Sequence, residues 1–397
     1  MRAVMIARDD SMSESIDRLY QQRICDIKTT CNQREPSRVP IMGNVSTWPV
    51  GYAGAKTRDL VFDRRLQTEV MCKYLDDVYI DCIMKLGLGP ALKTVWALES
   101  SSWGISPNEV TIQHAGGNCP MEPQEYPALI ADPMGFMLNG LGPRKFPALR
   151  RPYPHNLEAL KQAAFGMMDS AADYAANGQC AKERYGIPAI IGAKLYAPLD
   201  LIADRLRGVT GMLTDMHRHP QALADACEAL YPIYMKAAEK GITGDFPFAC
   251  TTAHVPTFLG PKKFAQFFWP TYRRMLLRVR ELGCQTLLFM EGTWEPYFDL
   301  LNELPPNTLI GLLEMDDPVE AKKRIGKNIT IMGGVSTELL ALGTKQECLD
   351  RAKQILDACA PGGGFLWAEG RSLLALGDAK PENLIAVNEF VHEYGKY

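Results

Sequence analysis

The sequence predicts a (β/α)8 barrel, and three observations carry that prediction. Eight short apolar runs recur along the 397-residue chain, bounded by Gly and Pro. Segments with the apolar spacing of amphipathic helices separate them, as expected when buried parallel strands alternate with helices. Three of the runs end directly at a glutamate. In this fold the residue that follows each strand faces the reaction space, so these glutamates are candidates for chemistry.

The eight expected strands are all short enough to be barrel strands rather than helices. In chain order they are Val39–Asn44, Tyr79–Gly87, Ile187–Leu195, Gly241–Phe246, Leu287–Met290, Leu309–Leu313, Ile329–Val335 and Phe365–Ala368. The fifth, sixth and eighth end at Glu291, Glu314 and Glu369.

Helices are expected around these strands, and several begin with Pro near the first turn, where its missing N–H costs nothing. They are Thr57–Lys73, Asn156–Ala176, Pro220–Lys240, Pro261–Leu282, Trp294–Leu304, Pro318–Ile325, Gln346–Ala360 and Pro381–Tyr394. One face of the second helix is apolar, and at this spacing it is expected to be core: Leu157, Leu160, Ala164, Met167 and Met168.

Residues 1–397 are expected to form one domain in which the barrel carries two additions. Residues 1–38 would be a helical extension, with its helix at Ser11–Thr30. Residues 88–154, after the second strand, are dense in Pro, Gly and aromatic residues, and insertions this long usually cover or carry a site. The insertion is interpreted as a lid or wall over the barrel mouth, and a surface insertion packed on its own aromatic residues is the alternative.

Composition narrows the class of protein. A hydrophobic content of 47% with 22% charged residues is typical of a globular protein with a sizeable core. The net charge of −3, without any run of Lys or Arg, argues against nucleic-acid binding. The longest apolar stretches fall short of the ~20 residues of a membrane span, and the N-terminus has too short an apolar centre for a signal peptide. Eleven cysteines without a Cys-x-x-Cys pair then suggest free thiols in the cytoplasm.

Three stretches of the chain carry a family resemblance. They are Tyr196–Leu201 with Leu206-Arg207-Gly208, Met332–Thr337 with Leu339-Leu340 and Gly343-Thr344, and Gly363–Leu366 with Pro381–Leu384 and Tyr394-Gly395. Together with Pro261–Tyr272 they resemble the uroporphyrinogen decarboxylase superfamily over roughly residues 39–397. That superfamily comprises the decarboxylases and the corrinoid-dependent methyltransferases built on the same barrel.

The positions at which this chain departs from the family pattern indicate which branch of the superfamily it resembles. The decarboxylases carry an Arg-Gln-Ala-Gly-Arg segment after strand one and an essential Asp at the tip of strand two. This chain has Gly43–Pro49, without a cation, and Met84–Gly87 at those places. A polyanionic porphyrinogen would lose its bidentate arginine contacts, so its decarboxylation is not expected.

The thiol-methylating members of the superfamily hold zinc through His-x-Cys at strand five and a Cys after strand eight. The matching positions here are Phe289, Glu291 and Glu369–Arg371, so no thiolate ligand is present. Because that zinc holds a soft thiolate substrate, its loss indicates a substrate that is not a thiol. The six histidines form no His-Glu-x-x-His pattern, so zinc has no strong site, and a different metal site from Glu291, Glu369 and His254 stays open.

The remaining members of that branch demethylate methyl ethers or methylamines and pass the methyl group to the Co(I) of a separate corrinoid protein. The cofactor carries the hard chemistry there, and the barrel must activate the leaving group with a proton or a Lewis acid. The resemblance implies that Glu291, Glu369 and Asp245 are catalytic and converge on one cavity with Glu314. Mutual repulsion and burial would raise their pKa values, so that one could act as a general acid.

Other residues near the strand ends are candidates for substrate contacts. The candidates are Asn44, Lys85, His254, Glu314 and Phe246. His254 could equally be an ordinary hydrogen-bonded loop histidine, Glu314 could cap the helix at Pro318 or pair with Lys322, and Glu369 could pair with Arg371. Gly333-Gly334 is interpreted as a place where the backbone approaches the corrinoid or substrate closely.

The sequence therefore predicts a cytoplasmic corrinoid-dependent methyltransferase that acts on a small methylated compound, with a methoxylated aromatic preferred. The expected partner is a corrinoid protein, and a homo-oligomer is left open. A decarboxylase of a small acid and a non-catalytic barrel that binds a corrinoid protein are the alternatives.

Overall fold

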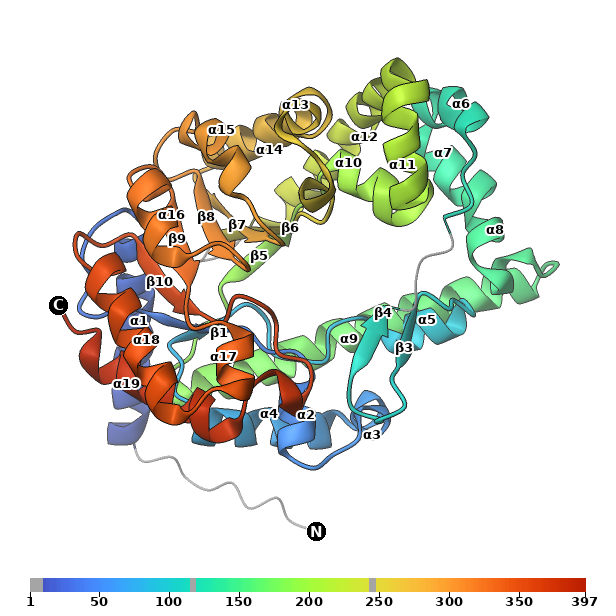
Figure 1. Cartoon of the computed structure of the whole chain (residues 1–397). Coiled ribbons are helices and arrows are strands. Elements are labelled where there is room, and N and C mark those ends of the chain that lie inside the picture. Colours follow the sequence, from blue (N-terminus) through green and yellow to red (C-terminus); the bar gives the residue numbers. More distant parts are fainter. Residues whose placement is uncertain (1–9, 115–118, 243–247) are drawn as a thin grey trace, which may run out of the picture.

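A computed structural model describes residues 10–114, 119–242 and 248–397, and eight parallel strands form its central sheet (Figure 1). The sheet order is β2-β1-β10-β9-β8-β7-β6-β5. The two edge strands meet where Ile83 pairs with Ala189, since the Ile83 N–H donates to Pro188 at 3.1 Å and the Ile190 N–H to Ile83 at 2.9 Å. These bonds close the sheet, which confirms the (β/α)8 barrel. The strands are β1 (Ile41–Gly43), β2 (Cys82–Ile83), β5 (Ile191–Lys194), β6 (Phe248–Thr252), β7 (Gln285–Met290), β8 (Leu309–Leu313), β9 (Thr330–Gly333) and β10 (Phe365–Ala368).

Helices surround the sheet and connect its strands. In the first half of the chain they are α1 (Asp10–Cys31), α2 (Trp48–Tyr52), α3 (Thr57–Phe62), α4 (Arg64–Asp77), α5 (Leu92–Ala97), α6 (Tyr126–Ala131), α7 (Pro133–Gly135), α8 (Gly142–Lys145) and α9 (His155–Tyr185). In the second half they are α10 (Pro198–Leu201), α11 (Gly208–Arg218), α12 (Pro220–Gly241), α13 (Pro261–Lys263), α14 (Trp269–Glu281), α15 (Phe298–Asn302), α16 (Pro318–Ile325), α17 (Thr337–Leu342), α18 (Lys345–Cys359) and α19 (Pro381–Tyr394). The helical extension expected at Ser11–Thr30 corresponds to α1.

Successive side chains of each strand point alternately into the barrel and out towards the helices. One hydrophobic cluster fills the inside of the barrel and includes Met42, Cys82, Phe248, Cys250, Leu287, Phe289, Ile310, Leu312, Met332, Leu366 and Ala368. Ile24, Ile27 and Cys31 of α1 join this cluster, so the N-terminal helix closes one end of the barrel. The outward residues, among them Ile41, Leu288, Met290, Ile331, Phe365 and Trp367, belong to the larger cluster beneath the helices.

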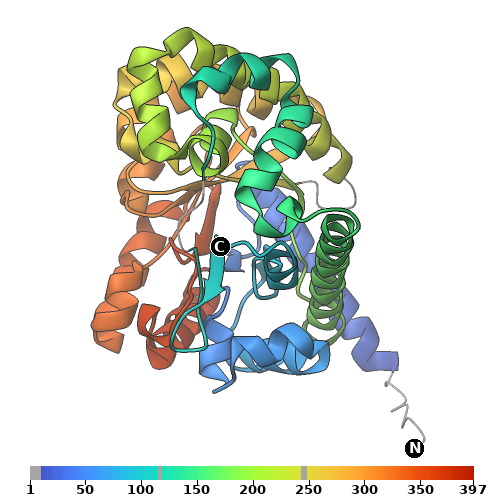
Figure 2. The same cartoon turned by 90° about the vertical axis from the view of Figure 1, so that its right-hand side faces the viewer.

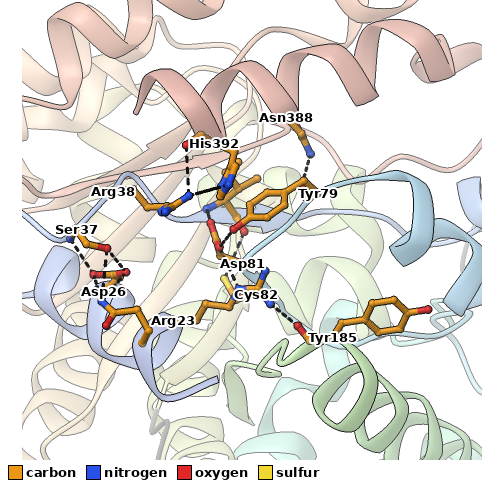
Figure 3. Close-up of polar contacts among 12 residues, drawn as sticks. Arg23, Asp26, Ser37, Arg38, Tyr79, Asp81, Cys82, Tyr185, Asn388 and His392 are labelled. Carbon is orange, nitrogen blue, oxygen red and sulfur yellow. Dashed lines mark hydrogen bonds and ion pairs between the residues drawn. The ribbon is translucent and has the colours of Figure 1, made fainter. Parts of the chain in front are cut away.

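The end that α1 closes is the one where the strands begin (Figure 3). Arg23 of α1 donates to Asp81 at 3.1 Å and to the Tyr185 carbonyl at 2.6 Å. Asp81 also accepts from the Tyr79 hydroxyl at 2.8 Å and from the Ile41 N–H at 2.9 Å. This buried network links α1, the start of β1, the segment before β2 and the end of α9, and α1 and α9 pack side by side (Figure 2).

The described part of the fourth strand, β6, begins after the range predicted for it. Of the expected run Gly241–Phe246, Gly241 ends α12, and residues 243–246 lie outside the described residues. The strand itself, Phe-Ala-Cys-Thr-Thr, has little aliphatic character. Its Thr251 is nonetheless fully buried against neighbouring strands, so tertiary packing overrides the weak local signal.

Two predictions about helices also need correction. The expected helix Thr57–Lys73 is broken at Asp63, whose carboxylate accepts from the Leu66 N–H and so begins α4. On α9 the predicted core face is wrong, since Leu157, Leu160, Met167 and Met168 are about half or more exposed. The buried face carries small residues instead, because a Cβ at Gly166 would lie 2.6 Å from the Thr94 backbone of α5.

The insertion at residues 88–154 carries short helices and a two-stranded antiparallel hairpin, β3 (Trp103–Ile105) and β4 (Ile112–His114). Tyr126 is fully buried and donates to Asp215 of α11 at 2.8 Å. Trp103 packs edge-on against His114. The insertion runs from α9 to α12 along one side of the molecule (Figure 1), and its role as a lid stays a prediction.

None of the helices in the described ranges is long and apolar enough to cross a membrane.

Candidate active site

Side chains at the carboxyl ends of the strands fall into two sets. On a strand, residues two positions apart point to the same side. Because Met42, Phe289 and Leu312 point into the barrel, the same alternation places Asn44, Glu291 and Glu314, each one residue past its strand, on the inward side. His254 lies two residues past β6 and contacts Glu291. Glu369 follows the outward-facing Phe365 and Trp367, and Lys85 follows the outward-facing Ile83. The four carboxylates expected in one cavity therefore do not all share one direction.

Four titratable side chains on three consecutive βα connections interact, and we call them the His254 cluster: Asp200, Asp204, His254 and Glu291. Asp204 lies on a π-helical turn, Ile202–Leu206, that continues α10. His254 Nδ1 lies 2.8 Å from Asp204 Oδ2, a short charge-assisted hydrogen bond. On the other side of the ring, Nε2 lies 3.3 Å from Glu291 Oε1, a looser contact.

The two carboxylates keep His254 protonated. The hydrogen bond to Asp204 and then the contact with Glu291 raise the pKa of His254 from 6.5 to about 10. The imidazolium therefore persists at neutral pH, with a proton on each ring nitrogen. Its side chain is 41% exposed and that of Glu291 is 38% exposed, so both remain within reach of a ligand.

Asp200 lies beneath this pair and is closed off from solvent. Its Oδ1 accepts from the Val255 N–H at 2.7 Å, which fixes the backbone next to His254. Burial raises the pKa of Asp200 to about 8, against the opposing effects of that hydrogen bond and of His254. Its Oδ2 is buried without a hydrogen-bond partner among the described residues. At neutral pH Asp200 is therefore held mainly in its neutral form.

Glu369 belongs to a separate group, the Glu369 cluster, formed with Asn44 and Tyr74. The Asn44 N–H donates to Glu369 Oε2 at 3.0 Å, and the Asn44 side chain donates to the Glu369 carbonyl at 2.9 Å. Burial raises the pKa of Glu369. Burial and then the negative charge of Glu369 raise the pKa of Tyr74. Glu369 is only 2% exposed. Glu369 Oε1, Asn44 Oδ1 and the Tyr74 hydroxyl have no partner in the part of the chain that the structure describes.

Glu314 holds the loop that follows β7. Its Oε2 accepts from the Gly292 N–H at 2.6 Å, directly after Glu291, and its Oε1 lies 3.6 Å from Arg371 Nε. The two alternatives raised for Glu314 are wrong, because Asp317 caps α16 and Lys322 donates to the Gly363 carbonyl. Arg371 contacts Glu314 and Glu338. Glu314 therefore positions the segment that carries Glu291.

Two further sequence expectations can be placed. Lys85 is exposed and lies over the Tyr174 ring, 5.7 Å from its centroid. Gly334 is needed for internal packing, because a Cβ there would lie 2.7 Å from the Ala368 carbonyl and 2.9 Å from the Trp367 ring. That packing explains the glycine without a corrinoid or substrate. Asp245 and Phe246 lie outside the described residues.

The described residues do not form a zinc site. Within the described ranges, no three His, Cys, Asp or Glu side chains are grouped so as to hold a metal ion. Of the three proposed ligands, Glu291 contacts His254, whereas Glu369 bonds to Asn44. Both ring nitrogens of His254 contact carboxylates, Nδ1 that of Asp204 and Nε2 that of Glu291.

Sequence reasoning did not single out Asp200 and Asp204 as site residues. Both lie in the Tyr196–Leu206 stretch that served only as a family signature. That stretch directly follows β5, so the position of two carboxylates in the first turns after a barrel strand was an available signal.

The fold is a (β/α)8 barrel, and it places this group of His, Asp and Glu side chains at the carboxyl ends of its strands. The family model described as uroporphyrinogen decarboxylase (URO-D) matches residues 128–394, well over half of the chain. The chain therefore belongs to the URO-D family.

Among solved structures, the chain is similar to a methyltransferase from Methanosarcina mazei, with a TM-score of 0.62 and 14% sequence identity. The likeness covers 94% of this chain and 98% of that one, and at this identity it shows a shared fold. No curated protein matches the chain.

Proposed function

We propose that this chain is an enzyme that removes a methyl group from a small methylated compound, with methoxylated aromatics as the substrate class, and passes it to a corrinoid protein. Family membership and the shared fold with a methyltransferase support the reaction class. The observation that carries the proposal is the protonated His254 between Asp204 and Glu291.

The chain's own task in this reaction is to stabilise the leaving group. When a methyl group leaves an aryl ether, negative charge develops on the oxygen, and a proton donor there lowers the barrier. Asp204 holds the ring of His254 through the shorter contact, at Nδ1. The longer contact at Nε2 leaves that N–H able to turn from Glu291 to a substrate oxygen.

The acidity of His254 suits a phenol as the leaving group. A phenolic hydroxyl has a pKa of about 10, and the pKa of His254 is raised to about 10. Proton transfer between two groups of equal pKa has a free-energy change close to zero. Neither the protonated nor the deprotonated form of His254 is therefore strongly favoured after the transfer. Glu291 retains its contact with the ring and stabilises the imidazolium between turnovers.

The cobalt of the partner's corrinoid would supply the nucleophile that accepts the methyl group. For that acceptor to reach the substrate, the proton donor must lie at an accessible face. The 41% exposure of His254 and the 38% exposure of Glu291 meet this requirement. Glu369, at 2% exposure, does not.

The test mixes the chain with a reduced corrinoid protein and a panel of methoxylated aromatic compounds. Methylcobalamin formation is followed by absorbance, and release of carbon dioxide is measured in parallel with a set of small acids. The proposal expects methyl transfer from at least one aryl ether and no decarboxylation. Carbon dioxide release without any need for corrinoid protein, or corrinoid-protein binding without turnover of any donor, would overturn it.

A further inference from the structure

Two cysteines outside the candidate site lie close together on different helices. Cys72 of α4 and Cys180 of α9 are 108 residues apart, and their sulfur atoms are 2.7 Å apart. A covalent S–S bond is about 2.05 Å long, so only a small movement separates the two thiols from a bridge. Both are free cysteines in the structure.

The two helices are already aligned on both sides of this pair. One turn before it, the Thr68 hydroxyl donates to Asn177 at 2.7 Å, and a further turn back Arg64 pairs with Asp173 at 2.5 Å. One turn after it, the Tyr185 hydroxyl donates to Asp76 at 2.6 Å.

The contacts therefore recur at every turn of two parallel helices, which pack along each other (Figure 1). The thiol pair occupies one step of this regular series. A bridge at that step would join helices that already contact each other one turn before it and one turn after it.

The two thiols differ in a way that suits stepwise oxidation. Cys180 is partly exposed, whereas Cys72 is 4% exposed. Burial and then the neighbouring Cys180 raise the pKa of Cys72 to about 12, with Arg184 partly offsetting the rise. Cys180 is therefore the thiol that an oxidant reaches first, and Cys72 is the thiol that resolves the product.

We propose that Cys72 and Cys180 form a disulfide modification site that hydrogen peroxide closes and a dithiol reopens. The Cys180 sulfur attacks one peroxide oxygen, the O–O bond breaks, and a sulfenic acid and one water form. The Cys72 sulfur then attacks the sulfenic sulfur, the S–O bond breaks, and a second water leaves as the S–S bond forms. Each sulfur loses one electron overall, and the peroxide takes up both.

The bridge would fix the helix that supports the segment after β2. Asn177 donates to the Leu86 carbonyl at 3.1 Å, and the Tyr174 hydroxyl bonds to both the N–H and the carbonyl of Gly89. Both residues lie within two turns of Cys180 on α9. Oxidation would therefore act on the barrel from outside the His254 cluster.

The experiment treats the full chain with a small excess of hydrogen peroxide, blocks the remaining thiols, and digests it with trypsin without reduction. Mass spectrometry should find Leu66–Lys73 joined to Gln162–Lys182, each of which holds one cysteine, with the loss of two hydrogen atoms. The monomer should also melt several degrees higher, since a bridge restricts the unfolded chain, and dithiothreitol should reverse both changes.

Matched variants make the result specific. Cys180→Ser, at a partly exposed position, should abolish the linked peptide, Cys72→Ser should do the same, and Cys25→Ser, at an exposed thiol on α1, should leave it unchanged. Wild-type chain that keeps both thiols alkylatable would overturn the proposal. So would a link to another cysteine, or a bridged protein that melts lower than the reduced one.

Discussion

The two ends of the barrel treat buried charge differently. Where the strands begin, both oxygens of Asp81 accept hydrogen bonds, from Arg23, Tyr79 and the Ile41 N–H (Figure 3). Where the strands finish, Glu369 and Asp200 each keep one buried oxygen without a partner among the described residues. An unpaired buried polar atom costs free energy, so its presence in a native fold calls for an explanation.

The difference indicates that one end of the barrel stabilises the fold and the other end carries the chemistry. The saturated Arg23–Asp81 network stabilises the junction of α1 with the barrel. Burial raises the pKa values of the under-paired Asp200 and Glu369 at the other end, and beside Asp200 the side chains of His254 and Glu291 stay partly exposed. Barrel enzymes place chemistry at that end and stability at the other. Substitutions at the two ends should therefore change different measured quantities.

Asp81→Asn should give the largest effect of these substitutions, and that effect should be a loss of stability. Arg23 and Asp81 are 7% and 5% exposed, and removing one partner of a buried pair leaves an uncompensated charge. We expect a loss of about 3–5 kcal/mol in the free energy of unfolding, measured with urea. The control Glu69→Gln, in an exposed pair with Arg65, should cost less than about 1 kcal/mol. The comparison fails if folded Asp81→Asn has lost methyl transfer.

Glu291→Gln should leave stability nearly unchanged and slow methyl transfer by roughly two powers of ten, because Glu291 keeps the general acid His254 protonated and in place, and a general acid contributes at least that much. The side chain is 38% exposed and contacts His254. Glu295→Gln is a matched control on the same loop, since that residue is 64% exposed and pairs with Arg324. Rates are compared by methylcobalamin absorbance. Equal rates for the two variants would remove Glu291 from the mechanism.

Asp204→Asn should move the pH dependence of the reaction. Asp204 is the first cause of the rise in the pKa of His254 from 6.5 to about 10, so its loss lowers that pKa. A reaction that needs protonated His254 declines above about pH 10 in the wild type and at a lower pH in the variant. The related stability contribution of His254 is full below pH 6.5 and is lost as the pH rises through about 10. An alkaline limb at the same pH in both proteins would contradict the assignment.

Glu369→Gln should have the smallest effect on rate, less than about threefold, because Glu369 is buried and bonds to Asn44. Its raised pKa means that the folded chain binds the proton more tightly than the unfolded chain. The stability of the wild type should therefore fall, relative to the variant, as the pH rises above the usual carboxyl range. Urea unfolding at two pH values checks this. A loss of rate as large as that of Glu291→Gln would instead make Glu369 catalytic.

The sequence was sufficient to predict the barrel because most strands are strongly apolar. Glu291 and His254 were named as candidate site residues because they follow strands. It did not include Phe248–Thr252 in the fourth strand, since this segment has a weak apolar signal. It also expected Glu369 to face the reaction space, and strand alternation turns that side chain outward with Trp367. On α9, close packing through small residues such as Gly166 reversed the face that hydrophobicity predicted. These errors share a cause, because each outcome depends on a packing partner distant in sequence.

The most direct test of the central claim is the dependence of the methyl-transfer rate on the pKa of the phenol that leaves, measured for the wild type and for His254→Gln. If His254 protonates the departing oxygen, the wild-type rate should depend only weakly on that pKa, because the proton offsets the developing charge. The variant should show a steeper dependence, with the least acidic phenols slowed most. Parallel slopes in the two proteins would contradict proton donation by His254.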